Sequence, residues 1–145
     1  MTDIRSKQFR EKIRMMERKL ELLEKNNNEF CCEAITLTQS HTLIEIGRAK
    51  SIALKDLSIR LNLDISTTSR SVDSLVKKKY VQRVTSEIDR RSVNIFLTDN
   101  GKKLFCDIEN KMDNYFEQMF SRVPEQEMEN VLYSLDLILD AFNKK

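Results

Sequence analysis

"NLDISTTSRSVDSLVKKKYV", residues Asn62 to Val81, is the stretch that decides the fold of this 145-residue chain. Asp64 is a favoured residue type for the N-cap of a helix. Apolar or half-polar residues then recur with helical spacing, at Ile65, Thr68, Val72, Leu75 and Val76. The opposite face of this helix is expected to carry Ser66, Thr67, Arg70, Ser71, Ser74 and Lys77. The pattern predicts an amphipathic helix with a face of small hydroxyls and basic groups.

A shorter helix is predicted directly before it, in "ALKDLSIRL" (Ala53 to Leu61), and the two together describe a helix-turn-helix. Small hydroxyls let a helix enter a DNA major groove deeply, and Arg70 can reach guanine or a phosphate. Lys77, Lys78 and Lys79 at the end of the helix would lie near the DNA backbone. We therefore interpret the outer face of this helix as a DNA-reading surface.

Two short strands follow, "YVQRV" and "SVNIFLT", and the loop "TSEIDRR" joins them. A β-hairpin after a recognition helix is a wing. Arg90 and Arg91 at its tip are expected to enter the adjacent minor groove, where narrow A·T-rich DNA concentrates negative potential. Asp89 is expected to pair with a neighbouring arginine and stiffen the tip. In isolation Asp89-Arg90-Arg91 would be an ordinary polar turn.

Long amphipathic helices flank this middle region, and the fold is expected to be mainly α. Residues 1–28 and 104–145 are predicted to be dimerisation helices, and residues 35–103 the winged helix-turn-helix, in one domain. A helix is also predicted at Leu37 to Arg48, and Leu37, His41, Leu43 and Ile44 are expected to face inward from it. The last helix is expected to begin at Pro124. The alternative to a homodimer is that the apolar faces of these terminal helices pack against each other within one chain.

Charge is unevenly distributed along the chain. Residues 47–103 hold 13 Lys and Arg against 6 Asp and Glu, a net +7, while the rest holds 12 against 17, a net −5, consistent with the total of +2. A basic middle between acidic flanks suggests double-stranded DNA as the partner, although chance clustering on solvated faces also gives such a pattern. The longest run without a charged residue, 34–44, has 11 residues, about half of the ~20 that cross a bilayer. The first residues lack the apolar segment of a signal peptide, so we expect a cytoplasmic protein without membrane contact.

The segment Ala53 to Leu104 resembles the winged helix-turn-helix of the MarR (multiple antibiotic resistance regulator) family. Asp89 and Arg91 fall on its Asp-x-Arg wing pair, and Leu97, Thr98 and Gly101 fall on its Leu-Thr-x-x-Gly motif. The resemblance implies a homodimeric regulator of a pseudo-palindromic operator, usually a repressor released by a small ligand or by oxidation. Lys79 stands where the family usually has Gly, at a left-handed cap that costs a non-glycine residue about 1 kcal/mol.

Other functions have less support. One His and two Gly residues, with no Cys-x-x-Cys or His-x-x-x-His, predict neither an enzyme, a metal site nor a cofactor. A winged helix used only for protein contacts remains the alternative function. The adjacent Cys31 and Cys32 are candidate sensors of thiol-reactive inducers; the alternative is that they are small buried side chains. Cys106 is expected to be a small buried side chain. If Cys31 and Cys32 do not act as sensors, the ligand site is expected between the dimerisation helices and the winged domain.

Overall fold

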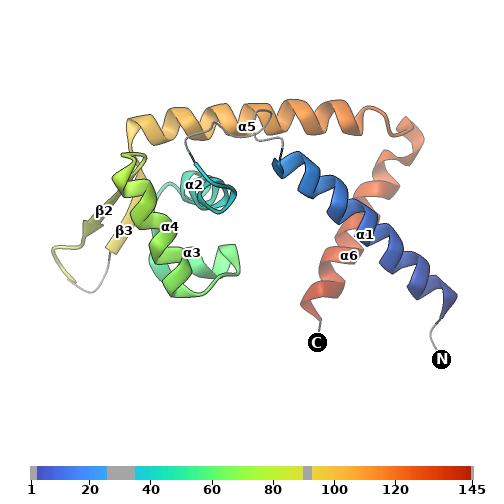
Figure 1. The fold of residues 1–145 in the computed structure, drawn as a ribbon, viewed down its shortest axis with the longest axis horizontal. Helices are drawn as coiled ribbons and strands as arrows, with labels where there is room; N and C mark the ends of the chain where they lie inside the picture. Colours follow the sequence, from blue (N-terminus) through green and yellow to red (C-terminus); the bar gives the residue numbers. More distant parts are fainter. Residues whose placement is uncertain (1–2, 26–34, 90–92, 145) are drawn as a thin grey trace. The chain divides into compact units, whose positions relative to one another are not determined.

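The computed structural model describes residues 3–25, 35–89 and 93–144, with the side chains of 21–25 left aside. These residues fall into two compact units, 1–109 and 110–145, and helix α5 runs across the boundary. Figure 1 shows the elements in chain order. They are α1 (Ile4–Lys25), α2 (Leu37–Ala49), β1 (Ile52–Ala53), α3 (Leu54–Leu61), α4 (Ile65–Lys77), β2 (Val81–Thr85), β3 (Val93–Leu97), α5 (Asp99–Phe120), a 3₁₀ turn (Glu125–Glu127) and α6 (Met128–Asn143).

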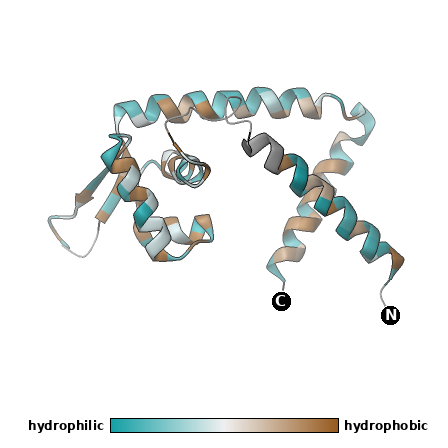
Figure 2. Ribbon diagram, in the orientation of Figure 1, coloured by the Kyte–Doolittle hydropathy of each residue, from teal (hydrophilic) through white to brown (hydrophobic). Residues whose placement is uncertain are grey.

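The core of the first unit lies between α2, α3, α4, the sheet and the start of α5. It is apolar, and its side chains are nearly inaccessible to solvent. The most deeply buried apolar residues are Leu43, Ile46, Leu57, Val72, Leu75, Val81, Ile95 and Ile108. Figure 2 shows α4 banded with hydrophobic and hydrophilic residues, as expected for a helix with one face on this core. The mainly helical fold with a small wing is confirmed.

The sheet has three antiparallel strands in the order β1-β3-β2. Strands β2 and β3 form the predicted hairpin, in a register that pairs Val81 with Leu97 and Thr85 with Val93. Strand β1 was not expected from the sequence. It has only two residues, Ile52 and Ala53, and Ile52 pairs with Ile95. A two-residue strand is too short to show an alternating pattern, so its pairing partner alone defines it.

Helix α2 begins with a capping box, in which the Thr36 hydroxyl accepts from the Gln39 amide and the Gln39 side chain accepts from the Thr36 amide. The expectation that Leu43 and Ile44 face inward is confirmed. The same expectation for Leu37 and His41 is wrong, because both are exposed. Leu37 lies in the first turn of α2, beyond the edge of the core, and His41 lies outside the inward face that starts at Ser40.

The turn after α4 uses a left-handed residue, Lys79, at φ 67°. The Lys79 amide donates to the Val76 carbonyl at 3.0 Å and the Tyr80 amide donates to the Leu75 carbonyl at 3.0 Å, which is the Schellman pattern. The expected left-handed cap without glycine is therefore present. Its conformation is the one that glycine adopts at least cost.

The start of α5 holds this turn in place. The Thr98 hydroxyl donates to the Lys79 carbonyl at 2.6 Å, and the Thr98 amide donates to the Tyr80 carbonyl at 3.0 Å. The same hydroxyl caps α5 by accepting from the Gly101 amide at 3.0 Å. A Cβ on Gly101 would lie 2.0 Å from the Tyr80 carbonyl oxygen, so only glycine fits there. The Leu-Thr-x-x-Gly motif thus fastens the end of α4 to α5.

The terminal helices expose their apolar residues. No residue of α6 is buried, and Leu132, Leu135, Leu137, Leu139 and Phe142 are all exposed. In α1, Phe9, Met16 and Leu20 are about half exposed. The last helix does not begin at Pro124 as expected: Pro124 opens the 3₁₀ turn, and α6 begins at Met128. Among the described residues, no helix is both long and apolar enough to cross a membrane.

Replacing Lys79 by Gly should stabilise the protein by about 0.5–1 kcal/mol, because relief of the left-handed strain exceeds the added chain entropy of glycine. Lys78→Gly is the matched control. Lys78 is helical at φ −79°, so its replacement should instead destabilise by about 0.5–1 kcal/mol. Urea unfolding at one protein concentration measures both changes. Equal effects of the two replacements would contradict the role assigned to Lys79.

Candidate nucleic-acid interface

Helices α3 and α4 form a helix-turn-helix, and they lie side by side with the β2–β3 hairpin next to α4 (Figure 1). The turn is built by Asn62, which is left-handed at φ 53°, and by a hydrogen bond from the Leu63 amide to the Ser58 carbonyl at 3.1 Å. Asp64 then caps α4 by accepting from the Thr67 amide at 3.1 Å. The predicted N-cap is confirmed.

The predicted outer face of α4 is largely at the surface. Ser66, Arg70 and Lys77 are exposed, and Thr67 and Ser74 are partly exposed. Ser71 is the exception: it is buried, and its hydroxyl lies 2.9 Å from the Thr42 hydroxyl of α2. The assignment of Ser71 to the outer face is therefore wrong. Its position on the border of the apolar stripe places it against α2, where a small hydroxyl with one partner is tolerated.

The direction of the Thr42–Ser71 hydrogen bond follows from the other contact of Thr42. The Thr42 hydroxyl already donates its single proton to the Thr38 carbonyl at 2.7 Å. The Ser71 hydroxyl must therefore donate to the Thr42 hydroxyl. Among the described residues, Thr42 is the one hydrogen-bond partner of the Ser71 side chain.

The side chain of Arg70 reaches back toward Thr67, in the first turn of α4. Its guanidinium donates to the Thr67 hydroxyl at 3.3 Å. Hydrogen bonds from the Thr67 side chain and then from the Thr67 amide lower the pKa of Asp64, and the charge of Arg70 lowers it further. Asp64 therefore keeps its negative charge and its cap at neutral pH, while the exposed guanidinium of Arg70 keeps further N–H donors for the surface.

Arg83 on β2 was not singled out from the sequence, yet it joins the wing to α4. Its guanidinium lies 2.9 Å from the Asp73 carboxylate and donates to the Ser69 carbonyl at 3.3 Å. These contacts hold the hairpin against α4. No local pattern in the sequence marks this pairing, because Asp73 and Arg83 lie on different elements and the Asp73 carboxylate is exposed.

The described part of the wing ends at Asp89 and resumes at Val93. Asp89 is exposed, and the Ser86 hydroxyl accepts from the Ile88 and Asp89 amides at 3.3 and 3.4 Å. Arg90 and Arg91 lie outside the described residues, so their pairing with Asp89 stays a prediction. Cys31 and Cys32 also lie outside them. Lys77 and Lys79 are exposed, and Lys78 donates to Gln39 of α2 at 2.8 Å.

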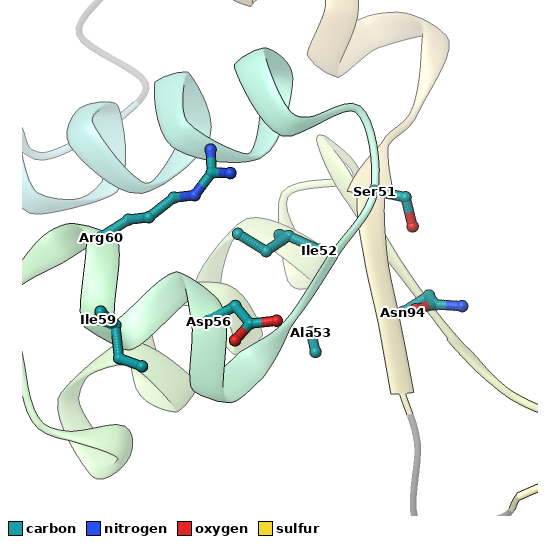
Figure 3. A pocket seen from close by; sticks show the side chains of 7 residues that line it. All are labelled: Ser51, Ile52, Ala53, Asp56, Ile59, Arg60 and Asn94. Carbon is teal, nitrogen blue, oxygen red and sulfur yellow. The ribbon is translucent and has the colours of Figure 1, made fainter.

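A hollow of about 530 Å³ lies beside the helix-turn-helix, between α3 and the start of β3 (Figure 3). Its two charged residues are of opposite sign: Asp56 lines it, and Arg60 turns toward α2, where it lies 4.0 Å from Glu45.

Within the described residues no group of three or more His, Cys, Asp or Glu side chains could hold a metal ion. Cys106 was expected to be buried, but it is exposed, because it faces away from Leu104 and Ile108 on α5.

Comparison with known proteins gives consistent matches. The MarR family model matches residues 35–93. The HTH-type transcriptional regulator BilQ of Clostridioides difficile (strain CD3) is 28% identical over 105 residues, covering 69% of this chain and 71% of that protein. A MarR transcriptional regulator from Methanosarcina mazei Go1 has a TM-score of 0.74 at 28% identity, covering 93% and 96% of the two chains. Streptococcus pneumoniae FabT, solved in complex with DNA, shares the fold with a TM-score of 0.86 at 21% identity, covering 95% and 97%.

The buried hydroxyl pair gives an asymmetric prediction. Thr42→Val should destabilise the protein by about 1–3 kcal/mol, because it leaves the buried Ser71 hydroxyl without a partner. Ser71→Ala should cost less, about 0.5–1.5 kcal/mol, since Thr42 keeps its bond to Thr38. In the double variant, much of the Thr42→Val loss should be recovered. Chemical unfolding of the three variants tests this, and additive losses would refute the pairing.

Proposed function

The chain belongs to the MarR family and is a transcriptional regulator with a DNA-binding helix-turn-helix, and on this premise we propose that it binds a pseudo-palindromic operator as a homodimer. In this proposal it is a repressor, and a small ligand or a thiol-reactive signal releases it. Its relatives and fold neighbours are transcriptional regulators, not enzymes.

One observation carries the DNA-binding part of the proposal: α4 presents hydroxyls and Arg70 outward while Arg83 joins it to the wing. Ser66, Thr67 and Arg70 are at or near the surface, and Asp73 and Ser69 hold Arg83. A helix and a hairpin held together in this way can contact a major groove and the adjacent minor groove at once. Lys77 and Lys79 would then add phosphate contacts.

The exposed stripes of α1 and α6 support the homodimer. Leu132, Leu135 and Leu139 on α6 and Phe9 and Met16 on α1 are exposed in the single chain. Apolar surface of this extent is unfavourable in water, and heptad-like stripes suit helices that pair with a second copy. A dimer would also set the spacing between two recognition helices, which a pseudo-palindrome requires. In the release step, Cys31 and Cys32 remain the proposed thiol sensors.

Two arginine replacements should separate the wing from the recognition helix. Arg70→Ala should weaken binding to the preferred duplex by about 1–3 kcal/mol and change binding to random DNA little, if Arg70 reads guanine. Arg91→Ala should weaken binding to both duplexes and reduce the slope of log K against log salt by about 0.9, one phosphate equivalent. Fluorescence anisotropy across a salt series, on a duplex selected with the wild-type protein, measures both.

Arg48→Ala is the matched control for both variants, because Arg48 lies on α2 and pairs with Glu109 at 3.2 Å. Its affinity should stay within about twofold of wild type. If Arg91→Ala keeps the wild-type affinity and slope, the hairpin is not a DNA-reading wing. A wild-type protein without salt-dependent DNA affinity would favour the alternative, a winged helix used for protein contacts.

The homodimer is tested on the apolar face of α6. Leu132→Glu with Leu139→Glu, two residues seven apart on one face, should shift the protein to its 17.1 kDa monomer, because charges would be buried in the interface. Ser134→Glu, an exposed polar position on the same helix, should leave the mass unchanged. Sedimentation equilibrium reads the mass, and circular dichroism checks that the variants are folded. A double variant that stays dimeric would remove α6 from the interface.

A further inference from the structure

A second hollow, of about 650 Å³, lies entirely within the winged unit. It is formed where the end of α2, the end of β3 and the first turns of α5 meet. Phe96, Leu97 and Phe105 form its apolar wall, and Lys50, Lys102 and Cys106 lie around them. Its volume falls in the range of small-molecule sites, about 300–1,000 Å³.

Gly47 is the reason that the aromatic wall can form against α2. A Cβ at Gly47 would lie 2.6 Å from a ring carbon of Phe105, so the glycine lets the ring rest on the helix backbone. The ring of Phe105 and the side chain of Phe96 remain partly exposed rather than buried. The result is an aromatic surface that faces the hollow and is left in contact with solvent.

The charges around the hollow have one sign. Lys50 and Lys102 are the charged residues that line it, and no carboxylate does so. Both lysines are exposed, and neither forms an ion pair with another described residue. The neighbouring hollow in Figure 3 differs in this respect, because Asp56 and Arg60 both line it. An apolar wall with two ammonium groups favours an anion that has an apolar body.

The backbone at Lys50 adds a second observation. Lys50 follows α2 with φ 68° and ψ −49°, close to the strained γ-turn conformation. Strained non-glycine residues of this kind gather at ligand sites and switch regions. Here the strain falls on a residue that lines the hollow, in the short turn that leads to β1.

From these observations we propose that the hollow binds a small apolar anion. Its apolar body lies against Phe96, Leu97 and Phe105, and its anionic group lies between Lys50 and Lys102. If the proposed function holds, a bound anion would also affect the position of the wing. Leu97, which lines the hollow, pairs with Val81 in the hairpin, and Ser51, which also lines it, leads into β1.

The test uses 8-anilinonaphthalene-1-sulfonate, an aromatic anion whose fluorescence rises in apolar sites, and the uncharged N-phenyl-1-naphthylamine, which has the same ring body. Lys102→Gln should weaken binding of the anion about tenfold, the loss of one close charge contact. Lys103→Gln is the matched control, since Lys103 is the neighbouring exposed lysine and does not line the hollow. It should stay within about twofold of wild type. The neutral probe should not distinguish the two variants.

A second measurement locates the probe, because exposed apolar residues elsewhere also bind such dyes. In a Cys31→Ser, Cys32→Ser background, Cys106 is the one remaining thiol of the three in the chain. Saturating sulfonate should slow alkylation of Cys106 by iodoacetamide several-fold, and Lys102→Gln should shift this protection to higher probe concentration.

Equal sulfonate affinity in Lys102→Gln and Lys103→Gln, or no protection of Cys106, would overturn the proposal. Neither measurement requires DNA. A protein that binds the sulfonate at Cys106 but no duplex would refute the proposed function and leave this site standing.

Discussion

Two backbone carbonyls, those of Lys79 and Tyr80, are the point on which the arrangement of the winged unit depends. The hydroxyl and amide of Thr98 bind them, and the same hydroxyl starts α5 through Gly101. One threonine therefore ends the α4 turn and begins the next helix. Without a side chain at Gly101 the Tyr80 carbonyl can come close enough for this contact, and any other residue would push the two elements apart.

The strain at Lys79 has meaning in this setting. A left-handed lysine is costly, yet three hydrogen bonds around it, from the Lys79 and Tyr80 amides and the Thr98 hydroxyl, keep the turn in place. The lysine also keeps a positive charge at the end of the helix that the proposed function places on DNA. Arg83 gives α4 a second attachment through Asp73, this time to β2. The helix is thus held at its end by α5 and along its length by the wing.

Much of this could be predicted from the sequence because the evidence was local. The Asp64 cap, the hairpin and the buried Thr68, Val72 and Leu75 of the α4 stripe each follow from a few consecutive residues, although Ile65 and Val76 of that stripe are exposed. The left-handed residue at 79 followed from the family resemblance. Errors arose where a partner distant in the chain decides the outcome. Ser71 is buried because Thr42 lies opposite it, His41 is exposed because of where the core ends, and β1 exists only through β3. The role of Arg83 and the hollow beside Phe105 likewise depend on several elements meeting, which no short pattern records.

The Thr42–Ser71 contact has a consequence for competing states of the fold. If α4 turned about its own axis by one residue, Ser71 would leave α2 and Val72 or Arg70 would take its place. Val72 has no donor for the Thr42 oxygen, and Arg70 would bring a charge into an apolar core. A purely apolar contact would penalise such a rotation much less, because oily side chains interdigitate in several ways. The polar pair on the hidden side of α4 therefore selects a single rotational setting, and with it the set of side chains that the helix turns outward.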